Sequence, residues 1–150
     1  MMMSILNKYG FDSILDLRNG GRFQVLCYQL EVLMQQYLPE LEQHMRILRI
    51  PTDIYAANWF ITMFCYELSL DLVFCILDVF LLEGIKSLLR ISLALLKCME
   101  TQLLNMTYEE CMVYLSHCQK ELEIDSQTLL REAYTFKISN RLLQDIEDFF

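Results

Sequence analysis

Two consecutive segments of this chain are apolar on nearly every side, and they restrict the fold more than any other feature. As helices, the first would extend from residue 53 to about residue 66 and the second from residue 69 to residue 82. A helix that is apolar all round is stable in water only when neighbouring elements cover it on several sides. We therefore expect both segments to be buried centrally, with amphipathic helices around them.

Turn and capping residues predict where the helices begin and end. The expected helices cover residues 22–37, 40–48, 53–66, 69–82, 85–104, 107–117 and 125–136, with a last one from residue 139. The residues expected to cap their starts are Thr52 or Asp53, Ser69, Thr107 in a capping box with Glu110, Asp125 or Ser126, and Ser139. Gly84 is expected to end the second apolar helix in left-handed geometry. One apolar stripe is expected on the last helix, formed by Leu142, Leu143, Ile146 and Phe149.

The composition favours helix over strand and places the whole chain in one domain. Apolar residues make up 55% of the sequence, which is rich in leucine and contains 9 methionines. Unbranched side chains of this kind lose little rotamer freedom on a helix. A chain of 150 residues is long enough for a single core. The fold class that we expect is all-α, an irregular multi-helix array rather than a simple four-helix bundle.

Charge and hydropathy argue against several classes of partner. The net charge is −8, and no window clusters the Lys and Arg residues that a nucleic-acid or anionic-membrane surface requires. Charged residues interrupt the most apolar stretch, residues 68–96, so no transmembrane segment is expected. The opening methionines are not followed by the pattern of a secretory signal.

The sequence offers little material for an active site of its own. No catalytic triad order, nucleophile elbow or phosphate-binding glycine loop is present. His44 and His117 lie at polar positions that we expect to be exposed. Asp71 and Asp78 lie seven residues apart and so share a helix face. They can be interpreted as an acid–base pair, but the alternative is that one of them meets an arginine or a helix N-terminus.

The cysteines follow no zinc or redox spacing, so neither a metal nor a cofactor is expected. Cys111, His117 and Cys118 are the one metal-binding alternative, but the neighbouring positions 117 and 118 point to different helix faces. We expect the cysteines to be small core residues in a reducing compartment. They are Cys27, Cys65, Cys75, Cys98, Cys111 and Cys118.

One segment carries a specific family resemblance. Residues 55–64 read Tyr-Ala-Ala-Asn-Trp-Phe-Ile-Thr-Met-Phe, which resembles the third conserved motif of TBC domains, approximately Tyr-Ala-Ser-Gln-Trp-Phe-Leu-Thr-Leu-Phe. Residues 77–84 and 91–97 are similar to the two helices that follow in that family, in the same order and spacing. Shorter similarities upstream, at residues 8–10 and 28–39, and downstream, at residues 136–139, extend the resemblance over nearly the whole chain.

The resemblance implies a partial TBC domain, residues 1–150, equivalent to the C-terminal half of the domain in Rab GTPase-activating proteins that continue into a coiled coil. In that family an arginine and a glutamine complete the active site of a Rab GTPase. Their motifs, Ile-x-x-Asp-x-x-Arg and Tyr-x-Gln-Gly-Met, do not occur in this sequence. No catalytic residue is therefore expected here, and the finger-bearing half is expected to be absent from the chain. The family-motif residues that carry over are structural: Tyr55, Asn58, Trp59, Phe60, Asp78 and Gly84. Asn58 departs from the commoner glutamine.

Two functions follow from this resemblance. The chain is expected to be a fragment of a Rab GTPase activator, with a small Rab-type GTPase as partner in vesicle trafficking and no enzymatic site of its own. The alternative is an inactive TBC-derived interaction or scaffold module that binds a GTPase or a larger assembly. The expected location is the cytoplasm, with peripheral association with endomembranes left open. Because half of such a domain leaves apolar surface uncovered, we also expect self-association or capture by another protein.

Overall fold

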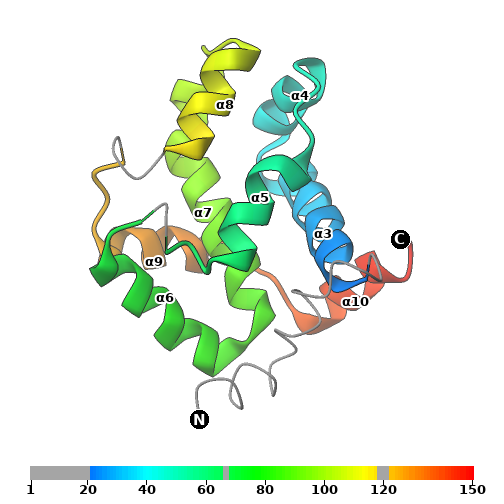
Figure 1. The fold of residues 1–150 in the computed structure, drawn as a ribbon. Coiled ribbons are helices and arrows are strands. Elements are labelled where there is room, and N and C mark those ends of the chain that lie inside the picture. Colours follow the sequence, from blue (N-terminus) through cyan, green and yellow to red (C-terminus); the bar gives the residue numbers. More distant parts are fainter. Residues whose placement is uncertain (1–20, 66–67, 118–121) are drawn as a thin grey trace.

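The computed structural model describes residues 21–65, 68–117 and 122–150, and within these ranges every regular element is an α-helix. The helices are α3 (Arg22–Tyr37), α4 (Pro39–Ile47), α5 (Thr52–Ile61), α6 (Leu70–Glu83), α7 (Ile85–Leu103), α8 (Tyr108–Ser116), α9 (Ser126–Thr135) and α10 (Asn140–Glu147). Figure 1 shows an irregular array in which α7 passes near the centre. The expected all-α class is confirmed. The resemblance at residues 8–10 and the position of Cys118 lie outside the described residues.

Three helices begin where local side chains satisfy free backbone amides. The Thr107 hydroxyl accepts a hydrogen bond from the Glu110 amide at 3.5 Å, and the Glu110 carboxylate accepts one from the Thr107 amide at 2.7 Å. Asp125 accepts a bond from the Thr128 amide at 2.7 Å, and Ser139 caps α10 in the same way. These bonds lie within a few residues of sequence, so the predicted starts of α8, α9 and α10 are confirmed.

The caps predicted for the two apolar helices are not formed. Pro51, with φ −73° and ψ 143°, occupies the position before α5, and no side chain caps that helix. Thr52 is already the first helical residue, so the prediction that Thr52 or Asp53 caps α5 was wrong. Ser69 does precede α6 but makes no capping hydrogen bond. A proline fixes the backbone entry to a helix without a side-chain bond, which accounts for the α5 start.

The core is built on α7 and α3. Eleven of the 19 residues of α7 are buried, and this helix packs against α3, α6 and α9. In turn, α3 packs against α4, α5 and α10. These two helices therefore occupy the central position that the sequence predicted for the segments 53–66 and 69–82.

Polar contacts join α3 to the end of the described chain. Arg22 at the start of α3 pairs with Glu147 of α10 at 2.9 Å. The Gln29 side-chain amide donates to the Leu143 carbonyl at 3.0 Å. Ile146 of the predicted stripe is buried, whereas Phe149 is largely exposed, so its inclusion in the stripe was wrong. Phe149 follows the end of α10 and no longer shares its helical periodicity.

A second polar cluster joins α6, α7 and α9. The Arg90 guanidinium contacts the Glu83 carboxylate at 2.5 Å and donates to the Ile138 carbonyl at 3.0 Å. It also lies over the ring of Tyr134, 5.4 Å from the centroid, while the Tyr134 hydroxyl donates to Glu83 at 3.2 Å. Because Arg90 and Glu83 are both largely covered, the cluster fixes the positions of three helices around the centre of the fold.

Candidate functional site

The residues of the 55–64 motif divide between the core and the surface. Tyr55, Ala56, Trp59 and Phe60 are buried on one face of α5, at the three- and four-residue spacing of a helix. Asn58 lies on the other face and is exposed. The ring of Tyr55 meets Trp59 edge-on at 5.2 Å. The motif is thus a core-packing stripe with one polar residue facing solvent.

The end of α5 differs from the prediction. The helix stops at Ile61 rather than near residue 66, because the Phe64 amide donates to the Trp59 carbonyl at 3.0 Å and turns the chain back. Met63 and Phe64 have φ values of 51° and 63°. This is a Schellman-type ending without glycine, so no stop signal is visible in the sequence. Phe64 packs on Trp59, with ring centroids 5.8 Å apart, and is fully buried.

Trp59 is unusual in one further respect. Its side chain is fully buried, yet among the described residues the indole Nε1–H has no hydrogen-bond partner. A buried donor left unpaired lowers the free energy of unfolding relative to a paired one. The free energy gained by burying the indole ring between Tyr55 and Phe64 therefore exceeds the cost of the unpaired donor, so packing determines the stability of Trp59 at this position.

Asp78 and Gly84 have different environments. Asp78 is exposed on α6, and within the described ranges it forms no ion pair. Asp71 is also exposed and lies in the first turn of the same helix, where its charge is favourable to the helix N-terminus. This agrees with the expectation that one of the two carboxylates meets a helix N-terminus. Gly84 is buried between α6 and α7 and has φ 73°, so the predicted positive φ is confirmed.

The face of α6 that points away from the core exposes large apolar side chains next to Asp71 and Asp78. Leu70, Phe74 and Leu82 expose 71%, 63% and 84% of their surface. Only Leu72, Val73, Ile76 and Phe80 are buried on this helix. The prediction that α6 is covered on all sides was wrong, because it packs mainly against α7 and α9 on one side. Large exposed apolar side chains grouped on one helix face are typical of an interaction surface.

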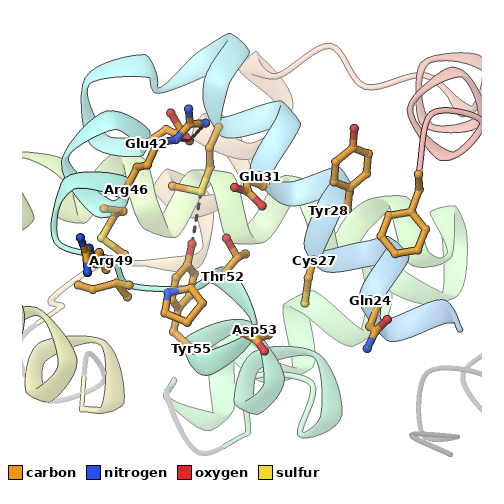
Figure 2. Close-up of a pocket in the computed structure, with 15 residues that line it drawn as sticks. Gln24, Cys27, Tyr28, Glu31, Glu42, Arg46, Arg49, Thr52, Asp53 and Tyr55 are labelled. Atoms are coloured by element: carbon orange, nitrogen blue, oxygen red, sulfur yellow. Dashed lines mark hydrogen bonds and ion pairs between the residues drawn. The ribbon is translucent and has the colours of Figure 1, made fainter. Parts of the chain in front are cut away.

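A cavity of about 540 Å³ opens between α3, α4 and the start of α5. Figure 2 shows Cys27 and Glu31 on α3 facing Thr52, Asp53 and Tyr55 at the start of α5. Asp53 was expected only as a possible cap of α5. No spacing rule in the sequence predicts this cavity, because its walls come from different helices.

Electrostatics at the cavity do not favour nucleophilic chemistry. Burial, with the nearby carboxylates of Asp53 and Glu31, raises the pKa of the Cys27 thiol to about 12. The thiol is therefore protonated at neutral pH and is not a nucleophile. Burial also raises the pKa of Tyr55, whose hydroxyl donates to the Met34 sulfur at 3.4 Å. These groups are suited to binding rather than to proton transfer.

The remaining candidates are scattered. His117 is exposed as expected, but His44 is half-buried and its Nε2 lies 3.2 Å from the Met106 carbonyl. Cys27 and Cys111 are buried and fit the expected core role, whereas Cys65 is exposed and does not. Cys75 and Cys98 are half-buried. In the part of the chain that the structure describes, no group of three or more His, Cys, Asp and Glu side chains could hold a metal ion.

Comparison with known proteins finds similarity over the same segments. Residues 1–104 match the family model described as the Rab-GTPase-TBC domain. The chain is 35% identical over 150 residues to Rab GTPase-activating protein tbc-11 of Caenorhabditis elegans, covering 98% of this chain and 16% of that protein. It is 32% identical over 127 residues to the ecotropic viral integration site 5 protein of Mus musculus, covering 81% of this chain and 15% of that protein. The chain thus spans about a sixth of the length of these relatives.

Proposed function

The chain belongs to the Rab-GTPase-TBC domain family, and we propose that it is part of a Rab GTPase-activating protein, a partial TBC domain that contributes binding surface to a Rab-type GTPase. The observation that carries this proposal is the 35% identity to a worm protein named as a Rab GTPase-activating protein, extending over 98% of the chain. The all-α array agrees with this assignment.

We propose that this segment has no catalytic site of its own. Neither the arginine motif nor the glutamine motif of the family occurs in its sequence, so accelerated GTP hydrolysis depends on residues supplied from elsewhere. An arginine of this kind contributes roughly 10³- to 10⁵-fold to GTPase turnover. Incubating the 150-residue chain with GTP-loaded Rabs is therefore expected to leave hydrolysis at its intrinsic rate. Stimulated hydrolysis would overturn this part of the proposal.

The motif residues then have two roles. Tyr55, Trp59, Phe60 and Gly84 hold the helices in place, as their burial supports. Asn58 and Asp78 are exposed and are not needed for packing. In our proposal these two polar residues are available for contact with a partner.

A chimera tests whether the segment works in an activator. Residues 1–150 would replace the matching segment of the worm tbc-11 protein, and GTP hydrolysis by a panel of Rabs would be measured. We expect the chimera to stimulate at least one Rab that the parent stimulates. Trp59→Ala in the chimera is expected to abolish activity through misfolding. Asp78→Asn should keep the fold, so a loss of activity in that variant would indicate that Asp78 contacts the partner. A well-folded but inactive chimera would count against the activator assignment.

The second candidate is an interaction module, and the exposed face of α6 favours it. In this proposal the face formed by Leu70, Phe74 and Leu82 binds another protein or a second copy of the chain. Replacing Phe74 and Leu82 by serine is expected to reduce self-association in light scattering. Val113→Ser on α8 is the matched control, since Val113 is equally exposed but lies on another helix. Equal association by both variants would contradict a role for α6.

Location follows from the family assignment rather than from the fold. Within the described residues, no helix is both long enough and apolar enough to cross a membrane. We propose a cytoplasmic protein that reaches endomembranes through its GTPase partner. Imaging of the tagged chain with and without the Rab that it binds tests this, and membrane recruitment independent of any Rab would contradict it.

A further inference from the structure

The exposed apolar side chains of α6 have a spacing that is typical of contact with another helix. Four apolar residues form a line along the helix, the α6 stripe, which consists of Leu70, Phe74, Leu77 and Leu81. Their separations of four, three and four residues are those at which one helix packs along another. Three of the four are exposed and Leu77 is half-buried. Figure 1 shows α6 at the edge of the array, beside α9. The α6 stripe thus faces solvent and has room for one further helix.

The charge beside the α6 stripe has one sign. Asp71 and Asp78 each come one residue after a member of the stripe, which is about 100° further round a helix. Both are exposed, so they form an acidic border along one side of the stripe. No Lys or Arg occurs on α6. The ion pairs formed among the described residues involve neither aspartate. The border is therefore negative and has no matching cation.

The spacing of the two carboxylates matches that of the stripe. Asp71 and Asp78 are seven residues apart, which is about 10.5 Å along a helix. A partner helix with a seven-residue repeat presents two side chains at this separation along each of its flanks. Lys or Arg at those flank positions would meet the two aspartates, whereas Asp or Glu would be repelled. The apolar line and its acidic border thus fit the same partner geometry.

Charge also distinguishes this partner from two other occupants. A second copy of the chain brings the same two aspartates and no base on α6, so contacts between copies depend on the apolar side chains alone. An anionic membrane surface would be repelled by the acidic border. A basic helix is the occupant whose charges complement this face.

We propose that the α6 stripe is the docking surface for an amphipathic helix of a partner protein, which carries apolar residues at heptad spacing and Lys or Arg along the flank that faces Asp71 and Asp78. This inference rests on the proposed role of α6 as an interaction face and adds the chemistry of the partner. The 14 residues of α6 are about 21 Å long, so the contact extends over about two heptads.

Fluorescence anisotropy with the 150-residue chain tests this chemistry. The probe is a labelled three-heptad peptide with Leu at the core positions, Lys at both flanking positions of each heptad and Ala or Gln elsewhere. Lysines on both flanks keep the peptide from pairing with itself. A second peptide has Glu at the flanks, and a third has the composition of the lysine peptide in an order without the heptad. We expect saturable binding of the lysine peptide, at least tenfold weaker binding of the other two, and a smaller lysine–glutamate difference at high salt.

Substitutions on α6 locate the contact. Phe74→Ser removes apolar area from the middle of the stripe and is expected to weaken the lysine peptide about tenfold. Asp71→Lys combined with Asp78→Lys should reverse the preference, so that the glutamate peptide binds more tightly. Glu109→Lys combined with Asp145→Lys is the matched control, since it changes the net charge equally at exposed positions on α8 and α10. The control should keep the preference for lysine. Circular dichroism checks that each variant is folded.

The outcomes separate the basic partner from the interaction face. Weaker binding in Phe74→Ser together with equal affinity for the lysine and glutamate peptides would retain α6 as an interaction face and overturn the basic partner. Unchanged affinity in Phe74→Ser, or no saturable binding of the lysine peptide, would overturn the docking surface itself. A reversal of preference by the control as large as that by the two α6 substitutions would show attraction by net charge only, and would also overturn the proposal.

Discussion

Gly84 provides the sharpest test of the backbone argument. Its φ of 73° and ψ of −151° lie in a region that is essentially restricted to glycine, and forcing another L-residue there costs about 1–3 kcal/mol. The site is buried between α6 and α7, so a new methyl group must also be accommodated. The unfolded chain of an alanine variant has less conformational entropy, which raises the free energy of unfolding by about 0.4–1 kcal/mol and offsets part of this loss. We expect Gly84→Ala to lower the free energy of unfolding by about 2 kcal/mol.

Urea denaturation followed by far-ultraviolet circular dichroism measures this change. The midpoint should fall while the slope of the transition stays constant, because the surface exposed on unfolding is the same. In a thermal melt the same loss corresponds to a decrease of roughly 4–8 °C for a domain of this size.

Two further variants separate backbone strain from crowding. Gly21→Ala is the first control, since Gly21 is exposed and has a negative φ of −79°. Because glycine is preferred over alanine at the N-cap position that it occupies, we expect a loss of up to about 1 kcal/mol, smaller than that of Gly84→Ala. D-alanine at position 84, introduced by peptide ligation, is the second. Its preferred angles are mirror images, so φ 73° and ψ −151° are relaxed for it. A D-alanine variant as unstable as Gly84→Ala, or a fully stable Gly84→Ala, would refute the reasoning.

Three other predictions concern a cap, an ion pair and a thiol. The pKa of Glu110 lies below its usual 4.5 because the carboxylate accepts a hydrogen bond from the Thr107 amide. The stabilisation that the ionised carboxylate gives to the folded chain is therefore present above about pH 4.5 and is lost as the pH falls through the lower pKa of the folded state. The protection factors of the α8 amides, which correct the exchange rates for the pH dependence of intrinsic exchange, should therefore fall on acidification, but Glu110→Gln should abolish this pH dependence. Arg90→Met leaves the largely covered Glu83 carboxylate without its ion-pair partner, although the Tyr134 hydroxyl still donates to it, and is expected to lower the free energy of unfolding by about 2–3 kcal/mol. An unchanged thermal midpoint would count against the polar cluster. Cys27, with a pKa of about 12, should react with iodoacetamide far more slowly than the exposed Cys65 at pH 8, and equal rates in peptide mapping would contradict its assigned burial.

The helix limits that the sequence predicted correctly share a local cause. The capping box at Thr107, the caps at Asp125 and Ser139, and the stop at Gly84 each depend on groups within about five residues. Such interactions exist in the short segment itself, whichever elements pack around it. They can therefore be inferred from sequence alone.

The end of α5 shows where this reasoning fails. Met63 and Phe64 adopt positive φ although neither is glycine or asparagine. The conformation persists because the Phe64 ring is buried against Trp59, a contact whose free energy exceeds the local backbone strain. Propensity favoured a longer helix, and tertiary packing ended it.

For the candidate site, the family motif could be recognised in the sequence, but which of its residues are buried and which are exposed could not be predicted from it. The sequence named Tyr55, Trp59 and Phe60 together with Asn58, and only the structure placed Asn58 in solvent. The cavity had no sequence signal, because its walls come together only when α3 packs against α4 and α5.

The sequence by itself determined the helical class, most helix boundaries and the family, because periodicity, caps and motif order are encoded along the chain. It also showed that α6 is apolar on nearly every side. Only the tertiary structure decided that α7 and α9 cover one side of α6 and leave Phe74 and Leu82 exposed. The physical reason is that an apolar stripe has the same free energy of burial against any partner. Its periodicity therefore does not specify which neighbour covers it.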